Sequence, residues 1–283
     1  MIDGSDTHLL AGGNGVVFHV LGTASATLEG VSLSSNGSAS AIETEPASSL
    51  LVFGASVDGA TSNGVGTVLV HGGQLSLVED TFTNLTQDVV CGNNGNLLVD
   101  RCTFESSRIN SDGCGVIVTR SRFDHFLGEA QNGEARFENN LITSDSQFDD
   151  AATVLKGTAG SYFRFNTFAN TSGVVFSAGT LQCDDSIEVS SNIFAWGTTV
   201  PPTCFTTYSL FDANVMQQGS GNQSADGSTF FVSPDSGDFH LGSNSPAKGA
   251  ADPSQTSTTI DFDGNPRPNP AGSVPDIGAF EAP

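Results

Sequence analysis

The sequence predicts an all-β fold, a right-handed parallel β-helix of about eight or nine coils that ends in an irregular tail. Three observations predict it. Only 14% of the 283 residues are charged, while 33 are glycine, a composition typical of many tight turns. A short apolar pattern recurs over about residues 1–200. The remaining residues, 201–283, lose this period but keep large apolar side chains.

Each repeat has two apolar residues separated by one position, then a turn residue, then an aromatic or aliphatic residue. The last position recurs at steps of 19 to 26 residues and is occupied by Leu33, Val57, Phe82, Phe104, Phe123, Ile142, Phe168 and Phe194. Alternation with period 2 places the apolar residues on one face of a short strand. One coil cannot bury that face alone, whereas stacked coils can. We therefore expect these side chains to stack about 4.8 Å apart.

The turn position holds asparagine in three consecutive repeats, at Asn140, Asn166 and Asn192. Stacked asparagine side chains can hydrogen-bond along the axis, so the sequence predicts a ladder here. A second strand is expected between repeats, at residues 68–70, 89–90, 153–155 and 173–176. Variable repeat lengths favour a β-helix over leucine-rich repeats or propellers, because insertions can extend from turns without disturbing the stack.

The charge balance excludes some classes of partner. The chain has 31 acidic and 9 basic residues, a net charge of −22. Nucleic acids and anionic membranes are bound by clustered Lys and Arg, so neither is expected. No segment reaches the roughly 18 apolar residues that would span a bilayer. The opening residues 1–4 resemble a strand and its turn rather than a signal peptide, so we expect the true N-terminus to be missing.

Five cysteines leave at least one thiol unpaired within the chain, and none has the spacing of a zinc site. Cys183 and Cys204 bracket the last clear coil, and we predict a disulfide between them. The alternative is a disulfide between Cys91 and Cys114, which lie about one coil apart.

A local cluster of arginines stands out in this acidic chain. It includes Arg101, Arg120 and Arg122, which are candidate catalytic residues. Two carboxylates, Glu105 and Asp124, occupy the same outward position one coil apart. A pair about 4.8 Å apart could bind Ca²⁺, or act as acid and nucleophile on a sugar. The alternative is that these groups form ordinary surface ion pairs or are simply solvated.

Two further surface features carry predictions. Glu138 and Arg164 share one outward register and are expected to form an ion pair between coils. The outward residues Leu51, Phe53, Leu98 and Ile117 are apolar. Such a stripe is expected to be covered by a loop or tail, or else to contact a partner.

The repeat resembles the pectin-lyase-like superfamily of right-handed β-helix proteins. The tail carries residues 239–241, 245–247, 261–268 and 275–281 in an order similar to a C-terminal segment of secreted bacterial β-helix proteins, the choice-of-anchor Q or polymorphic outer-membrane-like tail. The resemblance implies a bacterial protein outside the cytoplasm. Lyases of the superfamily neutralise a uronate with Ca²⁺ or Arg and remove a proton with Lys or Arg. The resemblance thus implies that Arg101, Arg120 or Arg122 neutralises the uronate or removes the proton, although no lyase motif matches residue by residue.

The tail, residues 201–283, is predicted to pack back on the last coils as a C-terminal cap, with Arg267 in a bidentate pair with one of Asp261, Asp263, Asp276 or Glu281. The function expected first is a secreted or cell-surface module that contacts polysaccharide as a binding or structural protein. The alternatives are a polysaccharide lyase or glycoside hydrolase acting on acidic polysaccharide, and a fragment of a larger adhesin. The sequence does not decide whether the protein is an enzyme, nor its oligomeric state.

Overall fold

The computed structural model describes residues 2–3, 8–11, 16–36, 40–60, 68–83, 89–124, 128–144, 153–170, 181–183, 186–196, 200, 203–213 and 219–283. The chain forms two compact units. The N-terminal unit is Met1–Ala135 with Lys156–Thr158, and the C-terminal unit is Arg136–Leu155 with Ala159–Pro283. Both contain parallel β-sheets, and the described helices are two short 3₁₀ turns.

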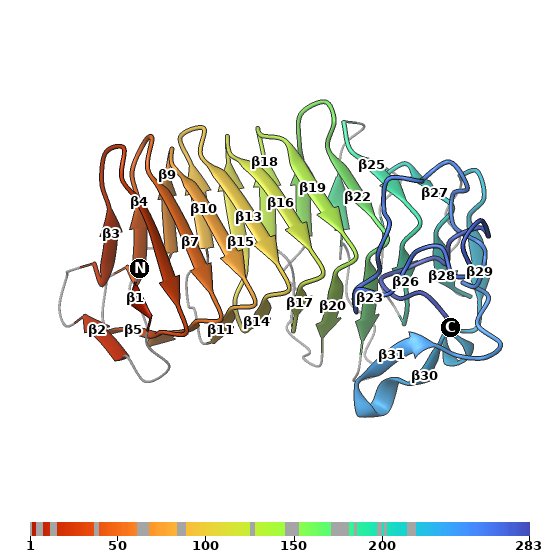
Figure 1. The fold of residues 1–283 in the computed structure, drawn as a ribbon. Helices are drawn as coiled ribbons and strands as arrows, with labels where there is room; N and C mark the ends of the chain where they lie inside the picture. The colour runs from red at the N-terminus through yellow and green to blue at the C-terminus, as the bar shows by residue number, and fades with distance from the viewer. Residues whose placement is uncertain are drawn as a thin grey trace. The chain divides into compact units, whose positions relative to one another are not determined.

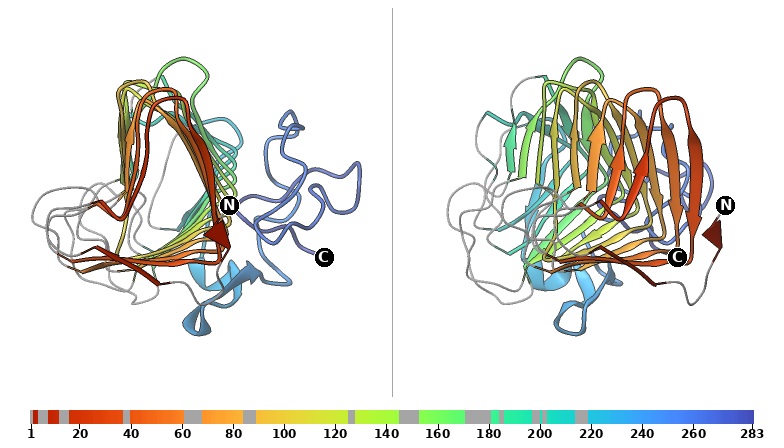
Figure 2. Two further views of the ribbon diagram at one scale, coloured as in Figure 1. Left: turned by 60° about the vertical axis from the view of Figure 1, so that its left-hand side comes forward. Right: turned by 90° about the vertical axis from the view of Figure 1, so that its left-hand side faces the viewer.

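The N-terminal unit is a parallel solenoid in which every turn contributes one strand to each of three walls (Figures 1 and 2). Its first wall contains β1 (Ile2–Asp3), β4 (Ser25–Glu29), β7 (Ser49–Phe53), β10 (Gln74–Val78), β13 (Asn96–Asp100) and β16 (Gly115–Thr119). Its second wall contains β2 (His8–Ala11), β5 (Ser32–Asn36), β8 (Ser56–Ala60), β11 (Thr81–Thr83), β14 (Thr103–Glu105) and β17 (Arg122–Phe123). Its third wall contains β3 (Phe18–Val20), β6 (Ile42–Thr44), β9 (Val68–His71), β12 (Val89–Gly92), β15 (Ile109–Asp112) and β18 (Gly128–Gln131).

These strands make a solenoid of about six turns, which confirms the predicted fold class. The coil count differs slightly from the predicted eight or nine. The strands expected at residues 68–70, 89–90 and 153–155 are present as β9, β12 and β21 (Thr153–Lys156). The one expected at 173–176 lies outside the described residues.

The C-terminal unit has walls of the same kind. Its first wall contains β19 (Ala135–Glu138), β22 (Tyr162–Arg164), β25 (Glu188–Ser190) and β27 (Thr206–Thr207). Its second wall contains β20 (Leu141–Ser144), β23 (Thr167–Asn170), β26 (Ile193–Phe194), β28 (Leu210–Asp212) and β29 (Gln223–Ala225), and its third contains β21 and β24 (Leu181–Cys183). Parallel pairing thus continues beyond the boundary predicted between residues 200 and 201. An antiparallel pair follows, β30 (Phe231–Ser233) and β31 (Asp238–Leu241), with η1 (Gly227–Thr229) and η2 (Pro234–Ser236).

The predicted column of aromatic side chains forms the core of each unit. In the N-terminal unit, Phe104 pairs in register with Phe82 and Phe123, and the ring centroids are 4.8 and 4.6 Å apart. In the C-terminal unit, Phe168 pairs with Phe194 at 5.6 Å. All five rings are buried. The predicted register is therefore confirmed.

The corner between the first and second walls has a constant construction. Two residues connect the strands at every turn from β4–β5 to β27–β28. The first of the two has a positive φ, as at Arg101 (55°), Arg120 (48°) and Phe165 (54°). A left-handed backbone is rare for bulky residues, so packing must hold it at Phe165. The second residue points its side chain along the corner, and we call its position the turn slot.

The asparagine ladder predicted for the turn slot is confirmed. The Nδ2 of Asn140 donates to the Oδ1 of Asn166 at 2.9 Å, and the Nδ2 of Asn166 donates to the Oδ1 of Asn192 at 3.1 Å. The backbone N–H of Asn140 also donates to the Oδ1 of Asn166 at 2.9 Å, and that of Asn166 donates to the Oδ1 of Asn192 at 2.8 Å. Buried backbone donors that strand pairing does not use are satisfied in this way.

Asp80 occupies the turn slot in the N-terminal unit, where it accepts the N–H groups of Ala55 (2.7 Å) and Val78 (3.0 Å). Burial raises the pKa of this carboxyl group from 3.8 to about 7, although these hydrogen bonds favour the ionised form. Because the pKa of Asp80 is higher in the folded than in the unfolded chain, the folded state binds the proton more tightly, and protonation of Asp80 stabilises the fold at low pH. This contribution is complete below about pH 4 and disappears as the pH rises through about 7.

Asp80→Asn should remove this pH dependence, since asparagine fills the equivalent slot at Asn140, Asn166 and Asn192. Between pH 5 and pH 8, the wild type should lose about 2–3 kcal/mol of unfolding free energy relative to the variant. Urea titrations of both proteins at the two pH values measure the difference. Parallel pH profiles would show that Asp80 does not titrate in this range.

Two disulfides connect successive turns, one in each unit. Cys183 and Cys204 are bonded as predicted, with Cα atoms 5.0 Å apart. Cys91 and Cys114, the alternative pair, are bonded as well, with Cα atoms 5.8 Å apart. Cys102 is the free cysteine, and its burial in the turn slot raises the pKa of its thiol well above the usual range.

Candidate functional site

The predicted arginine cluster lies at the corner of the N-terminal unit, and its guanidinium groups contact carboxylates. Arg120 binds both oxygens of Asp100, at 2.9 and 2.5 Å. Arg101 donates to Asp100 at 3.1 Å and also pairs with Glu79. Arg122 donates to Asp124 at 2.7 Å. The ion-pair alternative expected from the sequence is thus present, and a catalytic role for these arginines stays a prediction.

Glu105 and Asp124 are neighbours on successive turns, since the N–H of Asp124 donates to the carbonyl of Phe104 at 3.0 Å. Asp124 is also paired with Arg122. Among the described residues, no group of three or more His, Cys, Asp or Glu is placed to hold a metal ion. Ca²⁺ prefers six to eight oxygen ligands, so these two carboxylates would supply only part of a site. The calcium site also stays a prediction.

The apolar stripe in the N-terminal unit corrects an expectation. Leu51, Leu98 and Ile117 are 38%, 39% and 37% exposed, so the described part of the chain does not cover them, whereas Phe53 is half-buried. The three exposed side chains share one outward register on β7, β13 and β16 of the first wall. A shallow hollow of about 180 Å³ is lined by Ser76, Leu98 and Ile117.

A second polar cluster lies on the outer face of the first wall in the C-terminal unit. The predicted ion pair is confirmed, because Arg164 donates twice to Glu138, at 3.0 and 2.9 Å. The guanidinium group also lies 3.9 Å from the ring centre of Tyr162. Burial and the charge of Glu138 raise the pKa of Tyr162, which hydrogen-bonds to Glu138. Arg164 is only 9% exposed, so its position is fixed.

A groove of about 620 Å³ lies beside this cluster. Its walls include Ser161, Glu188, Phe205 and Thr207. Phe205 is 66% exposed, which is unusual for an aromatic ring. Glu188 pairs in register with Tyr162, and the next residue, Val189, pairs with Thr206. Phe205 directly precedes Thr206, so it lies next to Glu188 on the following turn. The groove therefore combines an apolar ring with a carboxylate and two hydroxyl groups.

The C-terminal segment lies along the corner of its own unit, over successive turns. Asn139 donates to the carbonyl of Ile260 at 2.8 Å, Gly278 donates to that of Ser191 at 2.9 Å, and Ala279 donates to the hydroxyl of Thr167 at 3.0 Å. These contacts fasten the segment to three successive turns of the unit. The guanidinium group of Arg267 covers the ring of Phe165, 4.4 Å from its centre.

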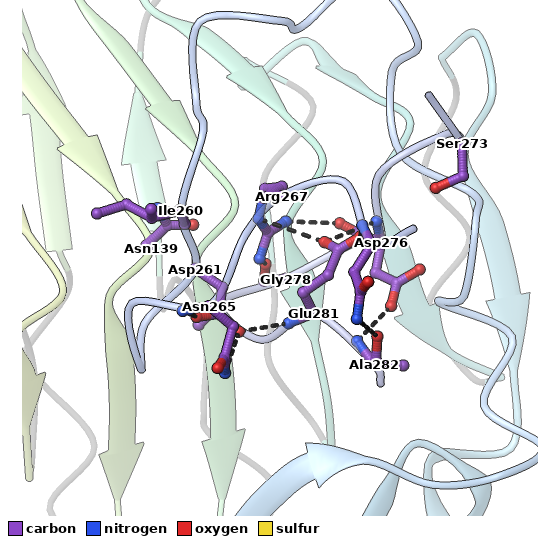
Figure 3. Close-up of polar contacts among 12 residues, drawn as sticks. Asn139, Ile260, Asp261, Asn265, Arg267, Ser273, Asp276, Gly278, Glu281 and Ala282 are labelled. Carbon is purple, nitrogen blue, oxygen red and sulfur yellow. Dashed lines mark hydrogen bonds and ion pairs between the residues drawn. The ribbon is translucent and has the colours of Figure 1, made fainter. Parts of the chain in front are cut away.

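The bidentate pair predicted for Arg267 is wrong (Figure 3). Its two terminal nitrogens donate to the carbonyls of Asp276 (2.8 Å) and Gly278 (2.9 Å), while Nε lies 3.5 Å from Glu281. The carboxylates are held instead by backbone N–H groups. Asp261, for example, accepts from Asn265 and Glu281 at 2.7 and 3.0 Å. The cluster therefore fixes the path of the chain and leaves Arg267 buried rather than open to a ligand.

Comparison with known proteins adds no assignment: no family model matches the sequence, and no curated protein matches it either. The resemblance to the pectin-lyase-like superfamily and to the C-terminal tail of secreted proteins therefore stays a prediction. Within the described part of the chain, no helix is long and apolar enough to cross a membrane.

Proposed function

We propose that this protein binds polysaccharide outside the cytoplasm through the groove beside Phe205. The exposed ring carries the proposal. An aromatic side chain left in water beside convergent polar groups is typical of a ligand site. The groove runs from residues 160–161, just before β22, across β25 to β27, so an extended ligand can contact several turns in succession.

The two disulfides support the location. Disulfides persist in oxidising compartments and are rare in the cytosol, where thiols are kept reduced. Both connect residues of successive turns and are part of the fold. A secreted or surface-displayed protein fits these bonds, and it also fits the net charge of −22, which favours solubility over binding to nucleic acid.

Phe205→Ala should weaken polysaccharide binding about tenfold, because it removes the apolar surface on which a sugar ring would lie. Affinity electrophoresis through gels that contain neutral or uronate polysaccharides finds a ligand, and calorimetry measures the constants. Leu21→Ala is the matched control, because Leu21 is 60% exposed and belongs to the N-terminal unit. If no polysaccharide in the gel slows the migration of the wild-type protein, the proposed binding is wrong. A purely structural module or a fragment of an adhesin is then favoured.

A further inference from the structure

Gln255 of the C-terminal segment reaches onto the outer face of the first wall and connects two charged residues. Its Oε1 accepts from the Nη1 of Arg164 at 2.7 Å, and its Nε2 donates to the Oε1 of Glu188 at 2.6 Å. Glu188 also lines the groove beside Phe205. The side chain of Gln255 therefore occupies a position next to the proposed binding groove.

The two charged groups do not depend on Gln255 for their positions. Glu138 holds the Nε and Nη2 of Arg164, and the ring of Tyr162 packs against the guanidinium plane. The hydroxyl of Ser190 donates to the carboxylate of Glu188 at 3.0 Å. If Gln255 moves away, a donor on Arg164 and an acceptor on Glu188 stay in place. Preorganised groups of this kind bind without a large ordering cost.

The pair favours a group that carries no net charge. A carboxylate would be repelled by Glu188, and an ammonium group would be repelled by Arg164. A ligand must accept one hydrogen bond and donate another from neighbouring atoms, as the amide of Gln255 does. Two adjacent hydroxyl groups on a sugar ring have this property, because each hydroxyl can either donate or accept a hydrogen bond.

We propose that Arg164 and Glu188 form a subsite for a vicinal diol of a neutral polysaccharide, and that Gln255 occupies it as an internal competitor. One hydroxyl accepts from Arg164, its neighbour donates to Glu188, and an adjacent sugar lies against Phe205. The inference rests on the proposed function and narrows its substrate class from polysaccharide to neutral sugars with free adjacent hydroxyls. Displacement of Gln255 then accompanies binding.

The test compares two glucose hexamers of equal size and charge by calorimetry. In the β-1,4-linked hexamer each ring keeps adjacent free hydroxyls, whereas in the β-1,3-linked hexamer the internal rings do not. Gln255→Ala should bind the β-1,4 hexamer at least tenfold more tightly than the wild type, and the β-1,3 hexamer no more than about twofold more tightly. Glu188→Gln in the same background should abolish the gain.

Thr256→Ala is the control, because Thr256 is exposed beside Gln255. Melting curves of all variants check that the fold is retained. Equal gains for both hexamers, or no gain for either, would overturn the subsite. The proposed function is judged separately, by the effect of Phe205→Ala in the wild-type background. If Phe205→Ala weakens binding but Gln255→Ala shows no preference between the two hexamers, the proposed function stands and the subsite proposal is wrong.

Discussion

Phe104→Ala should lower the free energy of unfolding of the N-terminal unit by about 3–5 kcal/mol. The ring of Phe104 is fully buried between those of Phe82 and Phe123, at 4.8 and 4.6 Å. Alanine leaves a cavity in the middle of this column. The rings of Phe82 and Phe123 are held by strands that pair with β14 on either side, so these rings cannot move toward each other to fill the cavity.

Chemical denaturation followed by circular dichroism measures the loss. Glu105→Ala is the matched control, because Glu105 is exposed at the next position of the same strand and should change stability by less than about 0.5 kcal/mol. If Phe104→Ala unfolds at the denaturant concentration of the wild type, the column does not contribute to stability as its burial indicates.

Arg267→Met should destabilise the C-terminal unit by about 3–5 kcal/mol. Methionine fills similar space, but it leaves the carbonyls of Asp276 and Gly278 without their donor. It also leaves Glu281 buried without a cation, and burial already raises the pKa of Glu281. A lone buried carboxylate is far less favourable than a paired one.

The loss appears as a lower melting temperature and as faster proteolysis after residue 242, where the segment leaves β31. Lys248→Ala removes an exposed cation from the same segment and should have little effect. An Arg267→Met protein with the melting temperature and protease resistance of the wild type would show that the guanidinium group does not hold the segment.

The core could be predicted from the sequence because strand alternation fixes which side chains point inward. The positions of Phe82, Phe104 and Phe123 follow from spacing alone, as does the ladder of Asn140 and Asn166. The repeat after residue 200 was missed for a physical reason. Thr206 takes a position that is apolar in earlier turns, although it is equally buried, so the pattern that ends at Phe211 was not recognised.

The candidate site was harder to predict, because its partners come from distant parts of the chain. The pairing of Arg164 with Glu138 follows from register, but no spacing relates Arg164 to Gln255, which lies 91 residues away. Similarly, Arg267 was expected to bind carboxylates, which are visible in a sequence. It binds carbonyls of Asp276 and Gly278, whose orientation depends on the folded backbone.

The constant two-residue corner between the first and second walls determines where this protein can change in length. One residue added there would turn every following side chain of that strand to the opposite face, so that Phe104 or Phe168 would leave the core. Other connections already differ, with three residues between β14 and β15 and four between β17 and β18. An engineer who wishes to graft a foreign peptide should therefore choose those connections and leave the corner intact.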